Sequence, residues 1–69
     1  MTMIDARGFS CPEPVIMLRK AMIEKGPSYE IIVDNRTSLE NISRFASHQG
    51  YTVEYYQENG DYVIHLAKE

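Results

Sequence analysis

The sequence predicts an α/β (or α+β) two-layer sandwich with the element order β-α-β-α-β-β. Two helices should lie on one face of a four-stranded mixed sheet. Short strand-like runs alternate with amphipathic segments, which favours crossover connections through helices. Near the C-terminus, Asn59-Gly60 separates two strand-like runs and is typical of an antiparallel hairpin. The 69 residues are enough for one domain with a modest core, so we expect a single domain over 1–69.

The first half of the chain contains a strand and a helix joined by a glycine turn. The strand is MTMIDA, residues 1–6, and it ends at Arg7-Gly8, where glycine allows a sharp turn. Residues 12–25 predict the first helix, with Pro12 at its first position, where a missing N–H costs nothing. Helical periodicity gives this helix one apolar face, made of Pro14, Val15, Leu18, Ala21 and Met22.

The second half predicts a central strand, a helix and a hairpin. Residues 29–34 carry three consecutive apolar side chains, as central strands do. The run Thr37-Ser38-Leu39-Glu40 has the form of a capping box for the second helix. That helix has an apolar stripe made of Leu39, Ile42, Phe45 and Ala46. Residues 51–57 and 62–66 alternate as the hairpin strands, and we expect tyrosines on the sheet face away from the helices.

The charge, the lengths of the apolar runs and the cysteine and histidine content exclude several classes of function. A net charge of -3 and a pI near 5.3 argue against direct nucleic-acid binding, which needs a basic surface. No apolar run approaches the roughly 18 residues of a membrane span, and the N-terminus does not have the form of a signal peptide. We therefore expect a cytoplasmic protein without membrane association. One cysteine and two distant histidines, His48 and His65, predict neither a metal site nor a bound cofactor.

Cys11, the only cysteine, precedes the first helix in the stretch GFSCPEPVIMLRK. The free N–H groups and dipole of a helix N-terminus lower a thiol pKa, and Arg7 adds positive charge, although Pro12 removes one donor. A lone cysteine is also often a small buried residue, and chemistry alone leaves the two interpretations even. Without a second cysteine no dithiol cycle is possible within one chain, and a dyad with His48 or His65 has no support from their positions. A solitary reactive thiol can carry a persulfide, a mixed disulfide or an acyl group.

The stretch DARGFSCPEPVIMLRKA, residues 5–21, resembles the signature of the TusA/SirA/YedF family of small sulfur carriers, whose hallmark is Cys-Pro-x-Pro at the start of the first helix. The matching positions are Asp5, Gly8, Cys11, Pro12, Pro14, Val15, Arg19, Lys20 and Ala21. Residues 33–53 look most like the YedF-type branch, which is associated with selenium or sulfur metabolism. The likeness covers essentially the whole chain.

This resemblance implies the predicted β-α-β-α-β-β sandwich and a sulfurtransferase-type activity. Cys11 would accept sulfur as a persulfide from a donor protein, typically a cysteine desulfurase, and pass it to a downstream acceptor protein. Three residues would shape the cysteine loop: Gly8, Pro12 and Pro14. Four charged residues are candidates for partner docking or for stabilising the persulfide anion: Arg7, Glu13, Arg19 and Lys20.

Two other functions remain open from the sequence. A regulatory protein-interaction module could use Ile16 and Ile23, seven residues apart, as an apolar strip. An RNA-binding sheet could stack bases on three tyrosines: Tyr51, Tyr55 and Tyr62. Three nearby acidic residues argue against the RNA interpretation: Glu54, Glu58 and Asp61.

Overall fold

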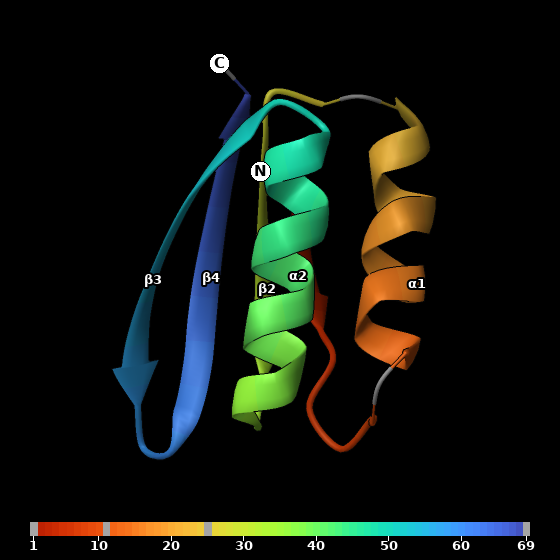
Figure 1. Ribbon diagram of the computed structural model, residues 1–69. Coiled ribbons are helices and arrows are strands. Elements are labelled where there is room, and N and C mark those ends of the chain that lie inside the picture. The colour runs from red at the N-terminus through yellow and green to blue at the C-terminus, as the bar shows by residue number, and fades with distance from the viewer. Residues whose placement is uncertain (1, 11, 25, 69) are drawn as a thin grey trace.

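The computed structural model describes residues 2–10, 12–24 and 26–68. Two helices lie side by side on one face of a four-stranded sheet (Figure 1), which confirms the predicted fold class. The elements in chain order are β1 (Thr2–Asp5), α1 (Glu13–Ala21), a 3-10 turn (Met22–Glu24), β2 (Ser28–Val33), α2 (Arg36–His48), β3 (Tyr51–Glu58) and β4 (Asp61–Lys68).

The sheet is mixed and has the strand order β1-β2-β4-β3. β1 and β2 are parallel because α1 returns the chain between them, whereas β4 is antiparallel to both of its neighbours. β2 is therefore central, as its apolar run predicts. Its burial alternates along the strand, so that Ile31 is fully buried under the helices while Ile32, on the other face, is only partly covered.

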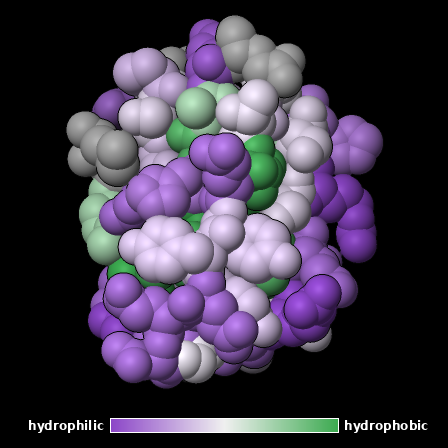
Figure 2. Space-filling model, turned by 90° about the vertical axis from the view of Figure 1, so that its left-hand side faces the viewer, coloured by the Kyte–Doolittle hydropathy of each residue, from purple (hydrophilic) through white to green (hydrophobic). Residues whose placement is uncertain are grey.

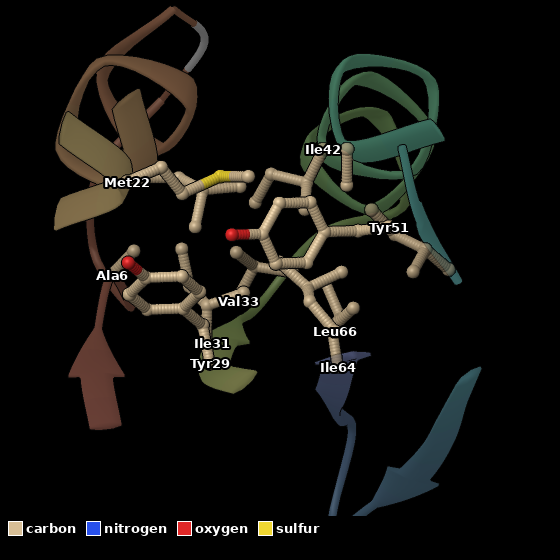
Figure 3. Close-up of a cluster of buried hydrophobic side chains, with 12 residues drawn as sticks. Ala6, Met22, Tyr29, Ile31, Val33, Ile42, Tyr51, Ile64 and Leu66 are labelled. Carbon is tan, nitrogen blue, oxygen red and sulfur yellow. The ribbon is translucent and has the colours of Figure 1, made fainter. Parts of the chain in front are cut away.

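The core lies between the sheet and the two helices (Figure 3). Every second residue of β2 and β4 points into it, and the predicted apolar faces of both helices cover these side chains. The side chains with no exposed surface come from all of these elements and include Leu18, Ile31, Val33, Ile42, Ala46 and Ile64. Each aliphatic side chain of this size contributes roughly 1.5–3 kcal/mol when it is fully buried.

The expectation that tyrosines occupy the open face of the sheet is wrong for most of them. Tyr51 is only 6% exposed and packs against Tyr29, with 5.9 Å between ring centroids. Tyr55 has the same parity as Tyr51 in β3, and its ring meets Tyr62 on that side of the sheet. The physical reason is that side chains alternate between the two faces of a strand. Because Tyr51 lies in the core, every second residue of β3 after it, including Tyr55, also lies on the side of the helices.

On the open face, Tyr56 stacks on His65 with their ring centroids 5.9 Å apart. The side of the molecule that lies at the left of Figure 1 is mainly hydrophilic, with scattered hydrophobic residues (Figure 2). Because Tyr51 is buried and Tyr55 and Tyr62 lie on the helix side, the three tyrosines considered for RNA binding form no stacking surface on the open face.

Three hydrogen bonds link the two buried tyrosines to the end of α1. The Gly26 N–H donates to Tyr29 Oη at 2.7 Å, and the Tyr29 hydroxyl donates to the carbonyl of Ala21 at 3.1 Å. The Tyr51 hydroxyl donates to the carbonyl of Gly26 at 2.8 Å. Burial, with Tyr29 as its neighbour, raises the pKa of Tyr51. A Cβ at position 26 would lie 3.0 Å from Tyr29 Oη, so a larger residue there would push the Tyr29 hydroxyl away by a few tenths of an ångström.

Both helices begin at a residue different from the predicted one. Glu13 is the first residue of α1 and Pro12 is its N-cap, so Pro12 lies one position before the predicted place. In α2 the N-cap is Asn35, whose Oδ1 accepts a hydrogen bond from the Ser38 N–H at 2.8 Å. The capping box at Thr37 is therefore wrong, because Thr37 already lies inside the helix and Asn35, two residues earlier, satisfies the free donor.

This cap gives a stability prediction with a built-in control. Asn35→Ala removes the acceptor of the Ser38 N–H and should lower the free energy of unfolding by about 1 kcal/mol. Thr37→Ala, at the residue that the sequence pattern favours, should change it by less than about 0.5 kcal/mol. Urea unfolding of the two variants measures both values. A larger loss from Thr37→Ala would contradict the observed cap.

Candidate functional site

The segment between β1 and α1 passes from the core to the surface and back. Ala6 is fully buried and donates its N–H to the carbonyl of Ile32 at 2.9 Å, which extends the pairing of β1 with β2 by one residue. The Phe9 N–H then reaches the carbonyl of Ala6 at 3.4 Å and closes a turn. Within that turn Gly8 has a φ of +85°, a conformation that costs a residue with a Cβ roughly 1–2 kcal/mol.

Cys11, the predicted sulfur-carrying residue, lies outside the described residues. Its neighbours Ser10 and Pro12 are both exposed. Pro14 is fully buried on the side of α1 that faces the core. A hydrogen bond of 2.9 Å from the Glu13 N–H to the carbonyl of Ser10 joins the two sides of position 11. The chain is therefore anchored in the core at Ala6 and Pro14, and the residues flanking the cysteine are at the surface.

The first turn of α1 offers few donors to an anion. Pro12 and Pro14 have no N–H, the Glu13 N–H is bonded to Ser10, and the Ile16 N–H is bonded to the carbonyl of Pro12 at 3.1 Å. Glu13 adds a negative charge in the same turn. The helix dipole remains, but the amides that normally lower a thiol pKa are mostly absent or occupied. The two prolines thus fix the backbone of this turn, but they also remove two N–H groups that could bind an anion.

The guanidinium of Arg7 is shared by two carboxylates. Its Nε and Nη2 donate to the two oxygens of Asp5 at 2.9 and 2.8 Å, and Nη1 lies 3.4 Å from Oδ2 of Asp61. The hydrogen bonds from Arg7 lower the pKa of Asp5 to about 2, and the same bonds raise the pKa of Arg7. Arg7 is one of the residues predicted to stabilise an anion, and the structure places its charge against Asp5 and Asp61.

A third carboxylate holds the residue next to Arg7. The Gly8 N–H donates to Oδ2 of Asp34, just after β2, at 2.8 Å. This hydrogen bond, and a second one from the side chain of Asn35, lower the pKa of Asp34. Sequence reasoning missed Asp34 and Asp61 as site residues, because they meet Arg7 and Gly8 only once the sheet has formed.

Neither histidine lies at this end of the fold. His65 is on the open face of the sheet, where its Nε2 is 2.9 Å from Oε2 of Glu30. His48 is the last residue of α2, roughly 18 Å along the helix axis from its first residue, Arg36. These positions place neither imidazole beside residues 7–10 and lend no support to a cysteine–histidine dyad. The described residues also contain no group of three or more side chains able to hold a metal ion.

Arg19 and Lys20 lie on the exposed side of α1, away from the turn at its start. A groove of about 410 Å³ separates α1 from α2 and contains Arg19 at its edge. Its lining is Val15, Arg19, Met22, Ile23, Phe45 and Gln49. A smaller hollow of about 250 Å³ lies along α1 beside Ile16. Ile23 borders both and is 77% exposed. The predicted apolar strip is thus an accessible surface, and the α2 side of the groove is a feature that the sequence pattern did not show.

Comparisons with known proteins agree with this fold. The family described as Sulfurtransferase TusA matches residues 2–68. The proposed sulfur carrier protein MJ0990 of Methanocaldococcus jannaschii is 44% identical over 55 residues, covering 77% of this chain and 73% of that protein. The proposed sulfur carrier protein YedF of Escherichia coli is 32% identical over 68 residues, covering 96% and 88%.

A solved structure agrees as well. The SirA-like protein from Desulfitobacterium hafniense superposes with a TM-score of 0.90 at 36% identity and covers the whole of both chains. Among the residues that the structure describes, no helix has the length and hydrophobicity needed to span a membrane.

The Arg7–Asp5 pair predicts a measurable titration. The pKa of Asp5 should be about 2 in the folded protein and should return toward its ordinary value of 3.8 in Arg7→Gln. Because the folded pKa is lowered, the pair contributes to stability above the ordinary pKa and loses that contribution as the pH falls through about 2. Carboxyl chemical shifts recorded by NMR across this range give both values. An Asp5 pKa near 3.8 in the native protein would show that the pair does not form in solution.

Proposed function

Because this chain belongs to the Sulfurtransferase TusA family, we propose that it is a sulfur carrier. Cys11 accepts sulfur from a donor protein as a persulfide and passes it to an acceptor protein. One structural observation supports this most directly. The chain is buried at Ala6 and Pro14 and exposed at Ser10 and Pro12, so the residues on either side of the cysteine lie at the surface between two buried anchors.

The proposed chemistry is an exchange between sulfur atoms. The Cys11 thiolate attacks the outer sulfur of a persulfide on the donor. A new S–S bond forms at Cys11 while the S–S bond of the donor breaks, and the donor leaves as a thiolate. One S–S bond replaces another and the transferred sulfur keeps its oxidation state and its proton, so the step needs no external oxidant or reductant. Attack by an acceptor thiolate on the same outer sulfur repeats the exchange and frees Cys11.

In this proposal the chain holds Cys11 where a partner protein can reach it, and the partner provides most of the groups that accelerate the sulfur transfer. Gly8, Pro12 and Pro14 set the shape of the cysteine segment through a positive φ and two fixed proline rings. The first turn of α1 has few free donors, and Arg7 is paired with carboxylates. Stabilisation of the persulfide anion by Arg7 is therefore limited, and further positive charge has to come from the donor or acceptor.

The exposed side of α1 is the proposed docking surface for these partners. Ile16 and Ile23 give it apolar contact area beside the charges of Arg19 and Lys20. Glu13, exposed in the first turn of the same helix, lies between this surface and the cysteine segment. A cysteine desulfurase is the donor proposed here, because it generates a protein-bound persulfide from free cysteine.

Sulfur loading tests the proposal directly. After incubation with a cysteine desulfurase, its pyridoxal phosphate and free cysteine, the protein should gain the mass of one sulfur atom, and a reductant should remove it. Cys11→Ser should gain nothing, because the hydroxyl cannot form a persulfide. Intact-protein mass spectrometry measures each case.

The neighbouring variant Ser10→Ala is the matched control, since Ser10 is exposed and the substitution keeps the backbone carbonyl that accepts from the Glu13 N–H. It should load sulfur like the native protein. Loading of Cys11→Ser, or no loading of the native protein by a desulfurase that charges its own thiol, would contradict the carrier function.

A further inference from the structure

We propose that Asp61 and Asp34 are positioning residues for the cysteine segment, an inference that rests on the sulfur-carrier function above. They act through Arg7 and Gly8, which lie four and three residues before Cys11 in the chain. Together with Asp5 they form a carboxylate clamp, a term used here for the contacts of these three carboxylates with Arg7 and Gly8.

The clamp joins three separate segments. Asp5 is the last residue of β1, Asp34 directly follows β2, and Asp61 is the first residue of β4. All three contact the same two consecutive residues: Asp5 and Asp61 bind the Arg7 guanidinium at 2.8 and 3.4 Å, and Asp34 accepts from the Gly8 N–H at 2.8 Å. The segment leading to Cys11 is thereby tied to the neighbouring strand and to the distant hairpin.

Stability alone does not account for this arrangement. The side chains of Arg7 and Asp5 are 49% and 55% exposed, and ion pairs this open to water add little to the free energy of folding. A bidentate guanidinium–carboxylate contact nevertheless fixes direction, because its two parallel hydrogen bonds allow one orientation. The turn also contains Gly8, whose backbone is otherwise free to adopt several conformations.

We expect the clamp to speed sulfur exchange by holding the cysteine segment in one position. Attack on an S–S bond requires the incoming sulfur to approach along that bond, so a small displacement of the thiolate lowers the rate of reaction strongly. A loop that is held before the partner arrives needs less ordering in the complex. Loss of the clamp should therefore reduce the rate of transfer within the complex and leave docking through α1 unchanged.

Two matched variants of the hairpin test this. Asp61→Asn removes one of the two carboxylate charges that face Arg7, whereas Glu58→Gln removes a carboxylate charge from the residue opposite Asp61 in the β3–β4 ladder. Steady-state sulfur uptake from a cysteine desulfurase gives kcat and the KM for the carrier. We expect Asp61→Asn to lower kcat about fivefold with KM unchanged, and Glu58→Gln to match the native protein. Urea unfolding confirms that both variants fold.

A second pair of variants tests the contact with Gly8. Asp34→Ala removes the acceptor of the Gly8 N–H, and Asp34→Asn keeps an oxygen that can accept it. The alanine variant should lose activity as Asp61→Asn does, and the asparagine variant should recover most of it. Amide hydrogen exchange at Gly8, measured by NMR, should accelerate in Asp34→Ala and Asp61→Asn and remain native-like in Glu58→Gln.

Equal kcat values in Asp61→Asn and Glu58→Gln, or a raised KM with unchanged kcat, would overturn the positioning role. Failure of the carrier function itself has a different signature, since the native protein would then accept no sulfur. In that case the amide exchange decides, because it needs no sulfur donor, and unchanged exchange at Gly8 in Asp61→Asn would show that Asp61 does not hold the segment.

Discussion

The pairing of β2 with β1 on one side and β4 on the other is the constraint on which the remaining structure depends. Ile31 is the residue where it is most visible, since it is fully buried and lies opposite Ile4 in β1 and Ile64 in β4. A shift of one residue in either pairing would turn the buried side chains toward water. The same register brings the end of β1, the residue after β2 and the start of β4 together, and the cysteine segment begins there.

If the proposed function holds, the reactive residue and the docking surface for partners lie on different parts of the molecule. The segment around Cys11 contains two prolines and an arginine that is already paired with carboxylates. Neither histidine lies near the described part of this segment, so it lacks the general base that a cysteine hydrolase uses to activate its thiol. Apolar and positively charged side chains meet instead at the end of α1 and in the 3-10 turn that follows it, at Arg19, Lys20 and Ile23. A carrier benefits from such a division, because a moderately reactive thiol retains its sulfur until a specific partner has docked.

Most of the fold could be predicted from the sequence, since strands and helices differ in their hydrophobic period and Asn59-Gly60 fixes the hairpin. The helix starts could not be fixed to the residue, because Asn35 and Thr37 are both good caps and only tertiary packing selects between them. The shared side of Tyr51 and Tyr55 was predictable from alternation. Which side faces the helices depends on a contact with Tyr29, distant in sequence.

In the candidate site, too, features set by neighbouring residues could be predicted from the sequence, whereas contacts between residues distant in sequence could not. The glycine turn and the proline-bounded start of α1 follow from local backbone chemistry, and the sequence predicts both. The partner of Arg7 at Asp61 is 54 positions away and could not be inferred without the sheet order. The groove between α1 and α2 likewise requires Phe45 and Gln49 of α2 to meet α1, which depends on how the two helices pack.

The central claim is that Cys11 is presented at the surface for exchange. The most direct measurement compares its alkylation rate by a small neutral reagent in the native protein and in the protein unfolded in urea, at one pH. Cys11 is the only cysteine in the chain, so the signal has one source. The carrier account predicts a native rate within about tenfold of the unfolded rate, as expected of an accessible thiol. A native thiol that reacts only at the rate of global unfolding would contradict it and identify Cys11 as a buried core residue.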